Sequence, residues 1–293
     1  MDADPRHAVV GFSGGRWTPE LPLTNLREPL LVRAALSVDT APSSTRFWVD
    51  LGKPRAVRVA AIPFLTVVRD DVECPPPDTT VVRWRAYDTP DLSDDPVAGS
   101  DTGWRTLYTP YPEGTLRAED EAFLDGLPAA EDRNFIPMPA ITVYPDADCI
   151  ARYWLCEIDL ACSGYDHLAV PRLFLAPGWQ PSHNFEIGAT EAFEDPSTVE
   201  TTPDGVEYWD VKPLRRLVRV SWGDLGASEA RTWVGGMQRR LGLSGQLYYI
   251  QHPDRPELWG WTSMLCRMRS LSPREAAAGG LVKSAIELKE VVA

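Results

Sequence analysis

The chain has 293 residues, 44% of them hydrophobic, and a formal net charge of −13. This length suits one large domain or two ordinary ones, with a sizeable core. The acidic balance and the lack of Lys and Arg clusters argue against binding to nucleic acid or to an anionic membrane. No apolar run approaches the ~20 residues of a membrane helix, and residues 1–5 lack the features of a secretory signal, so we expect synthesis in the cytoplasm and no membrane insertion.

Proline and tryptophan are both frequent, with 27 and 11 residues respectively. Proline breaks helices and suits short strands joined by loops, and tryptophan suits sheets that bury large flat surfaces. The five cysteines are odd in number and form no C-x-x-C pair. We therefore expect a β-rich chain with buried free thiols and no disulfide framework.

Predicted strands follow an irregular N-terminal segment, residues 1–20, and a loop at 21–29. Within 79–87, Val82, Trp84 and Ala86 alternate with outward-facing residues, as in a half-buried strand. Pro171 predicts an edge strand or a bulge within the last strand of the series. The predicted strands are 30–36, 47–51, 57–62, 79–87, 151–160 and 168–175.

Residues 88–148 are the least regular part of the chain, rich in proline and acidic residues. They predict long surface loops that contact a partner, because long loops in compact domains are often functional. One short helix is predicted at 118–126, where acidic residues fill the first turn.

A domain boundary is predicted near 180–205, where the sequence becomes polar and acidic. A helix follows at 229–241, with Ser228 as its N-cap and Gly242 after its end. Its apolar stripe predicts a helix packed on a sheet, and Gly235-Gly236 predicts close approach by a neighbouring strand. The remaining strands are predicted at 206–211, 214–222, 247–250, 258–268 and 284–290.

No motif of a catalytic or cofactor site is present. Paired-histidine metal motifs, G-x-S-x-G and phosphate-binding loops are missing, and Phe12-Ser13-Gly14-Gly15 lacks the strand–turn–helix setting of a nucleophile. We therefore expect no enzyme activity, no cofactor, and no catalytic, cofactor-binding or metal-ligating residue.

Two weaker alternatives for a site remain in the sequence. Cys156, Cys162 and His167 have a spacing that structural zinc sites rarely use, and they lack a fourth ligand. Loop carboxylates could form a glycosidase pair or a calcium site, but solvated loop acids are the simpler interpretation. These carboxylates are Asp70, Asp71, Glu73, Asp94 and Asp95.

Four tryptophans lie near predicted loops or strand ends: Trp104, Trp179, Trp209 and Trp259. Aromatic faces commonly bind carbohydrate, but packing in a core or an interface is the more frequent role of tryptophan. The residues that would bind a carbohydrate stay unknown from the sequence.

Five segments resemble known families. Residues 21–26 (LPLTNL), 33–35 and 47–58 (FWVDLGKPRAVR) resemble the discoidin-like, galactose-binding-like fold, with a tight turn at Gly52 and Pro54 between two strands. Residues 151–154 (ARYW) and 171–181 (PRLFLAPGWQP) are similar to segments of tail proteins in tailed phages. Residues 62–64 depart from the histidine–asparagine pair usual there.

The resemblance implies a mainly β fold: a galactose-binding-like jelly-roll β-sandwich over 21–185, with the loop insertion 88–148, and a smaller C-terminal α+β assembly domain over 206–293. It implies a structural component of a phage tail tip or baseplate, a distal or minor tail protein located in the virion tail. Its partners would be its own copies in a trimeric or hexameric ring, and other tail proteins such as tube, hub and fibre. The alternative is a carbohydrate-binding receptor-recognition module that binds a host surface glycan.

Overall fold

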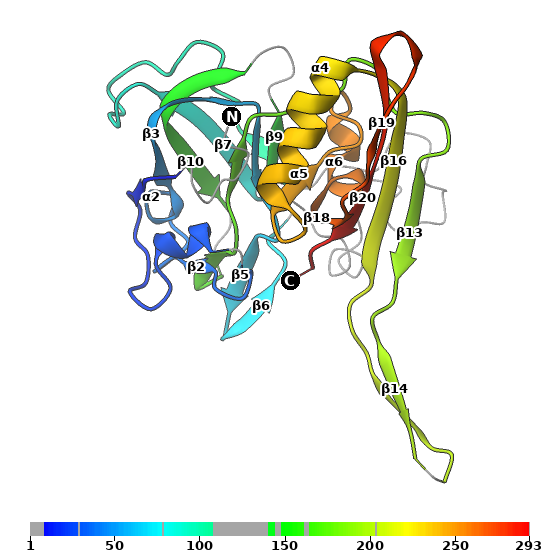
Figure 1. The fold of residues 1–293 in the computed structure, drawn as a ribbon. Coiled ribbons are helices and arrows are strands. Elements are labelled where there is room, and N and C mark those ends of the chain that lie inside the picture. The colour runs from blue at the N-terminus through cyan, green and yellow to red at the C-terminus, as the bar shows by residue number, and fades with distance from the viewer. Residues whose placement is uncertain are drawn as a thin grey trace, which may run out of the picture. The chain divides into compact units, whose positions relative to one another are not determined.

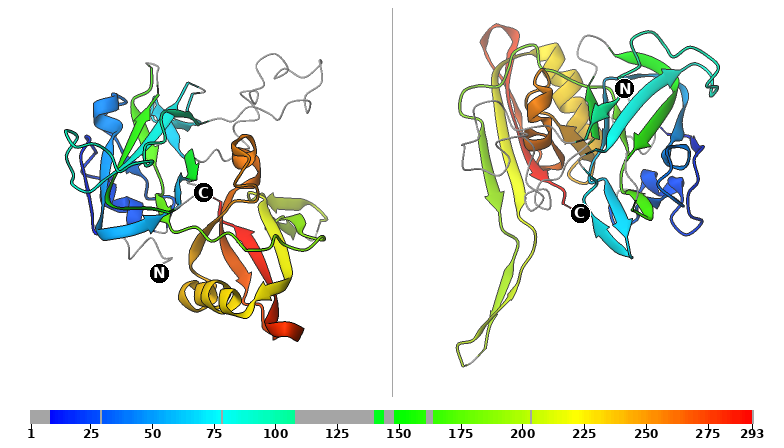
Figure 2. Two further views of the ribbon diagram at one scale, coloured as in Figure 1. Left: turned by 90° about the horizontal axis from the view of Figure 1, so that it is seen from above. Right: turned by 180° about the vertical axis from the view of Figure 1, so that it is seen from behind.

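The computed structural model describes residues 9–28, 30–77, 79–107, 140–143, 148–160, 164–202 and 204–292. The helix predicted at 118–126 lies outside these residues. The chain forms two compact units, and each is considered by itself (Figures 1 and 2). The first comprises Met1–Gly178 and Ile250–Ser263, and the second comprises Trp179–Tyr249 and Met264–Val292. The second unit begins at Trp179, just before the stretch 180–205 in which the sequence predicts the boundary, and not at 206, where the C-terminal domain was predicted to start.

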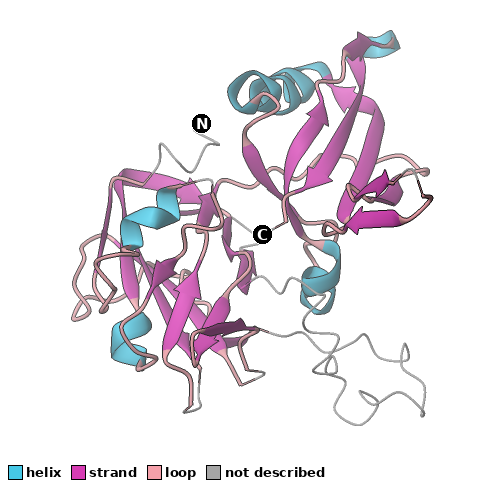
Figure 3. Ribbon diagram, turned by 90° about the horizontal axis from the view of Figure 1, so that it is seen from below, coloured by secondary structure: helices cyan, strands magenta, loops and turns pink. Residues whose placement is uncertain are grey.

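The first unit is built from antiparallel sheets, drawn as magenta arrows in Figure 3. One sheet has the order β1-β3-β10-β7-β8, the second β2-β11-β5-β6 and the third β12-β4-β9. The strands are β1 Gly11–Ser13, β2 Ala35–Leu36, β3 Phe47–Val57, β4 Val59–Ile62, β5 Thr66–Arg69, β6 Val72–Cys74, β7 Val81–Tyr87, β8 Arg105–Thr106, β9 Ala140–Val143, β10 Cys149–Asp159, β11 His167–Val170 and β12 Phe174–Ala176.

All three sheets contribute to one buried core, which makes the unit a β-sandwich. The five-stranded sheet contributes Trp84 and Trp154, and the opposing sheets contribute Val67 and Leu175. Short helical turns, Leu23–Arg27 and Pro42–Thr45 (α2), connect the first strands. The predicted mainly β fold class is therefore confirmed.

Strand β7 confirms the predicted alternation as far as Ala86, but Tyr87, predicted on the outward face, is fully buried and packs edge-on against Trp48. Val82, Trp84 and Ala86 are buried, whereas Arg83 and Arg85 point outward. Strand β10 pairs with β7 on one side and with β3 on the other, so it is a central strand of the sheet. A central strand is covered on both edges, which fits the burial of its aromatic side chains.

The sequence predicts a turn between two strands at Gly52, and this prediction is wrong. Strand β3 runs without a break from Phe47 to Val57, and residues 51–54 bulge out of its pairing with β10. Gly52 has a φ of 73°, and a Cβ atom there would lie 2.5 Å from Cγ2 of Val10. Glycine is thus required by a bulge and a close approach rather than by a turn between strands.

Three other predicted strands differ from the structure. The segment 30–36 is a strand only at Ala35–Leu36, and the segment 168–175 divides at Pro171, so that β11 and β12 lie in different sheets. Proline lacks the N–H that would continue a ladder. The start of segment 258–268 is a helical turn, α6 Trp259–Thr262, before β18 begins at Met264.

The second unit is an antiparallel sheet covered by one helix. Its strand order is β13-β16-β20-β18-β17, and β19 also pairs with β20. A two-stranded sheet, β14-β15, extends from it. The strands are β13 Thr190–Glu194, β14 Thr198–Thr201, β15 Glu207–Asp210, β16 Arg215–Gly226, β17 Gln246–Tyr249, β18 Met264–Ser270, β19 Arg274–Ala276 and β20 Leu281–Glu290.

The helix covers residues 227–241, in three parts: α4 Ala227–Glu229, a π-helical turn Ala230–Gly235 and α5 Gly236–Leu241. Ala230, Val234 and Leu241 pack into the core with Val220 and Trp222 of β16, as the apolar stripe predicts. None of the helices in the described residues is long and apolar enough to cross a membrane.

The ends of this helix differ in how well the sequence predicts them. Gly226 occupies the N-cap position, so the prediction of Ser228 as N-cap is wrong. Gly242 follows the last turn with a φ of 54°, as predicted. A Cβ atom at Gly235 would lie 2.5 Å from the Nη1 atom of Arg274 in β19, so the atoms nearest this glycine belong to a flexible side chain, whereas the sequence predicts the backbone of a neighbouring strand there.

Candidate functional site

The residues that the sequence singles out do not converge on one catalytic centre. Cys156 is buried in β10, and the Nδ1 atom of His167 lies 2.9 Å from the carbonyl oxygen of Ser37. Cys162 lies outside the described residues. Within those residues, no three His, Cys, Asp or Glu side chains gather to hold a metal ion.

Four of the five candidate acids lie in turns or loops, whereas Glu73 lies within strand β6 and pairs with Val68 of β5. Asp70 and Asp71 both have positive φ angles and connect β5 to β6, and the amide of Asp70 donates to Asp166. The carboxylate of Asp94 accepts a hydrogen bond from Thr89. These contacts give the acids a role in shaping turns.

Gly14 and Gly15 likewise shape the backbone. Both have positive φ angles, and a Cβ atom at Gly15 would lie 2.4 Å from the carbonyl oxygens of Ser44 and Arg46. Close backbone packing therefore accounts for this glycine pair.

The four tryptophans separate into two exposed and two packed side chains. Trp259 is buried, and its indole N–H donates to the carbonyl oxygen of His252. Trp179 packs against Trp222 and Trp233 in the second unit. Trp104 and Trp209 are 47% and 60% exposed, so they are the two that a ligand or partner could reach.

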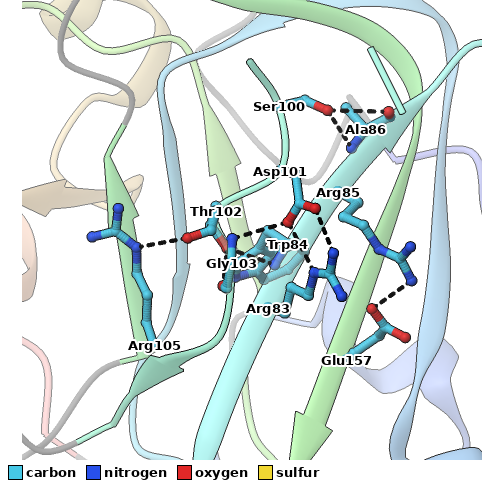
Figure 4. A network of polar contacts seen from close by, with 10 residues as sticks. All are labelled: Arg83, Trp84, Arg85, Ala86, Ser100, Asp101, Thr102, Gly103, Arg105 and Glu157. Carbon is cyan, nitrogen blue, oxygen red and sulfur yellow. Dashed lines mark hydrogen bonds and ion pairs between the residues drawn. The ribbon is translucent and has the colours of Figure 1, made fainter. Parts of the chain in front are cut away.

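The first exposed tryptophan lies on a loop that hydrogen bonds hold against β7 (Figure 4). The hydroxyl of Ser100 bonds both the amide and the carbonyl of Ala86. The hydroxyl of Thr102 accepts from the amide of Trp84 at 3.0 Å. The loop thus supplies hydrogen-bond partners to backbone groups of β7, and it holds in place the backbone just before Trp104.

Charged side chains of the outward sheet face surround this loop (Figure 4). The Arg83 guanidinium donates two hydrogen bonds to the Asp101 carboxylate, and its carbon lies 6.0 Å from the Trp104 ring centroid. This pairing lowers the pKa of Asp101 below its ordinary value and raises the pKa of Arg83. Arg85 donates to Glu157 of β10 at 2.7 Å. We call Arg83, Asp101, Trp104 and Arg105 the Trp104 surface.

The second exposed tryptophan lies on a two-stranded hairpin, β14-β15, which we call the arm (residues 195–212). Figures 1 and 2 show it running on from β13 and β16 beyond the end of the sheet. Every residue of both its strands is exposed. The turn is closed by backbone hydrogen bonds from Thr202 to Val206 and from Gly205 to Thr202.

One side of the arm carries three apolar side chains next to Glu207, whose carboxylate accepts a hydrogen bond from the Trp209 indole N–H. Val199 pairs directly with Trp209, so the two side chains share a face, and Val211 lies two residues further along on the same side. These three side chains are 45%, 60% and 79% exposed. Apolar side chains gathered on an exposed two-stranded hairpin make this face a candidate for contact with a partner.

The arm is also strongly acidic. It carries five acidic residues and one lysine, Lys212, which forms an ion pair with Asp210 at 3.1 Å. Sequence reasoning missed the hairpin because it took the acidic stretch for a boundary. The Asp204-Gly205 dipeptide between Val199 and Val206 was the available signal, since Asp-Gly favours tight hairpin turns.

Comparison with family models and with curated proteins gives no match. Among solved structures, the chain is similar to the family 32 carbohydrate-binding module of Clostridium perfringens NanJ in complex with galactose (13% identity, TM-score 0.35, 59% of this chain and 96% of that one). It is also similar to a family 32 module from a C. perfringens family 31 glycoside hydrolase (10% identity, TM-score 0.32, 59% and 99%). A third similar structure is the fucolectin of striped bass serum (10% identity, TM-score 0.36, 99% and 93%).

Proposed function

We propose that this protein is a non-enzymatic structural component of a phage tail tip, assembled in symmetric copies. The observation that supports assembly is the arm, an extended hairpin that presents Val199, Trp209 and Val211 to solvent. Apolar side chains on a projecting hairpin have no role in the core of their own unit, and burying them on a neighbour stabilises the association. The tail location rests on the resemblance of residues 151–154 and 171–181 to tail proteins.

Immunogold labelling of virions that carry this protein tests the location. Antibodies raised against the first unit avoid masking by a covered arm. Gold at the distal end of the tail supports the proposal. Virions with accessible tail ends that carry gold only on the capsid, or carry none, contradict it.

A second candidate function is glycan binding at the Trp104 surface. The half-exposed Trp104 ring can stack on a sugar face, and Arg105 and the Arg83–Asp101 pair supply donors and acceptors beside it. A glycan array probed with the wild-type chain and with Trp104→Ala tests this function. Binding that the substitution removes supports it. Equal signals from both proteins, or no signal from either, contradict it.

A further inference from the structure

The arm's chemistry indicates what covers it. Its apolar side carries Val199, Trp209 and Val211, and its acidic residues include Glu200 and Glu207. Glu207 lies beside Trp209 and accepts its neutral indole N–H, and the single lysine of the arm pairs with Asp210, so the arm keeps a surplus of negative charge next to its apolar side chains. A partner that covers these side chains gains most if it places positive charge beside the carboxylates. The expected partner surface is therefore basic, with exposed apolar side chains.

The second unit carries such a surface on its helix, although the chain as a whole has a net charge of −13. The helix and the two residues after it contain three arginines and a single acid, Glu229. Glu229 is already engaged, since it accepts hydrogen bonds from Trp179 and Ser182. The arginines Arg231, Arg239 and Arg240 are exposed.

Two further observations complete this surface. The Arg274 guanidinium lies against Gly235, and the Nη2 atom of Arg240 would be 3.2 Å from a Cβ atom at Gly236, so the glycine pair leaves room for two guanidinium groups. Leu243, just after the helix, is 53% exposed, and Leu271 is 51% exposed. We call the set the basic helix face: Arg231, Arg239, Arg240, Leu243, Leu271 and Arg274.

The two surfaces belong to the same unit but lie apart. The arm extends beyond the end of the sheet, whereas the helix packs against the sheet itself (Figures 1 and 2). Two different surfaces that fit each other allow two arrangements. Two copies can exchange both contacts in a two-fold dimer, or each copy can contact two neighbours head to tail in a ring or a filament.

We propose that the arm of one copy docks on the basic helix face of a second copy. This inference rests on the proposed function, because it names the contact by which the copies assemble. Trp209 and Val199 pack beside Leu243 and Leu271 of the next copy, and the arm's carboxylates pair with its arginines. Charge complementarity of this kind sets which surfaces meet and in which direction.

Charge reversal with the full chain tests the contact. One variant carries Glu200→Lys and Glu207→Lys in the arm, and the other carries Arg239→Glu and Arg240→Glu in the helix. Sedimentation velocity over a concentration series measures the mass of each variant, of their mixture and of the wild type. A control variant, Glu20→Lys with Asp95→Lys, makes the same charge change as the arm variant, at exposed positions of the first unit.

We expect the wild type and the control to form oligomers, and each reversed variant alone to associate about tenfold more weakly or worse, because like charges then face each other. Mixing the two reversed variants restores oligomers, since each arm then finds a complementary helix. A chain with all four substitutions also assembles. Restored assembly cannot arise from a misfolded variant.

Three results would overturn the proposal: a wild type that stays monomeric at every concentration, reversed variants that assemble like the wild type, or a mixture that does not recover. The proposed function fails separately. Gold at the tail tip combined with unchanged assembly of the reversed variants leaves the tail role standing and removes the arm–helix contact.

Discussion

Two antiparallel strand pairs of this protein carry large aromatic side chains but differ in what covers them. In β7–β10 of the first unit, Trp84 and Trp154 have no exposed surface. In β14–β15 of the second unit, Trp209 is 60% exposed. The first pair lies inside a five-stranded sheet that shares its core with two others, whereas the second forms a sheet of two strands in the part of the chain that the structure describes. Trp84 and Trp154 therefore stabilise their own fold, whereas the Trp209 side chain is accessible to a partner.

The largest expected effect is at Trp154. Trp154→Ala leaves a cavity in the sandwich core and lowers the free energy of unfolding by about 3–5 kcal/mol. Trp209→Ala changes it by less than about 0.5 kcal/mol, as exposed positions do, but weakens self-association. Urea denaturation followed by circular dichroism measures the free energy of unfolding of both variants, and sedimentation velocity measures the self-association of Trp209→Ala. Equal losses of stability would show that the arm packs within its own fold and would end the comparison.

The base of the arm provides the next prediction. Arg216 and Glu290 form an ion pair in which each side chain is 9% exposed, and the backbone N–H of Arg216 also donates to Glu290. Glu290→Gln removes the nearer of the two carboxylates that pair with the Arg216 guanidinium, Glu191 lying 3.8 Å away, and we expect a loss of about 1–3 kcal/mol in the second unit. Glu200→Gln in the exposed arm is the matched control, with a change near zero. If the two variants unfold at the same urea concentration, the contrast between buried base and exposed arm is wrong.

A smaller effect is expected at the bulge of β3. Gly52→Ala combines a left-handed backbone with a clash against Val10, and we expect a loss of about 1–3 kcal/mol. Gly99 has nearly the same φ, 74°, but open space where its Cβ would lie. Gly99→Ala therefore shows only the backbone strain, and the difference between the two variants isolates the close approach. If the melting temperature falls equally in Gly52→Ala and Gly99→Ala, the whole loss of stability comes from backbone strain and the contact with Val10 contributes nothing.

The smallest effect concerns pH at the Trp104 surface. The pKa of Asp101 is lowered by its hydrogen bond with Arg83, so the carboxylate stabilises the folded state above its unfolded pKa of about 3.8. That stabilisation is lost as pH falls through the lower folded pKa. Asp101→Asn should therefore lose less stability than the wild type between neutral pH and acid pH. Parallel pH curves for the two proteins would show that the Arg83–Asp101 pair contributes nothing, as many exposed pairs do.

Period-two patterns were the most informative part of the sequence. Val82, Trp84 and Ala86 were predicted on one face of β7, and they are buried. The bulge in β3 could not be predicted, because Gly52 and Pro54 also fit a turn, and only pairing with β10 decides between the two. Long-range pairing is not encoded in local propensity.

The candidate surfaces were harder to predict than the fold. Asp101 lies 18 residues from Arg83, and nothing in the local pattern pairs them. The arm lies in a stretch whose acidity resembles a linker. Its second strand was predicted, at 206–211, but its first strand, Thr198–Thr201, buries nothing and has no apolar periodicity, so the hairpin was not recognised. Surfaces meant for a partner lack the core pattern that makes buried strands recognisable.

Photo-crosslinking tests the arm–helix contact most directly. Trp209 is replaced by p-benzoylphenylalanine, and the variant is mixed with isotope-labelled wild-type chain before irradiation. The account predicts cross-links between chains, from position 209 to peptides spanning residues 231–243 or 271–274. Cross-links confined to one chain, or directed from position 209 to another part of the neighbouring chain, would contradict it.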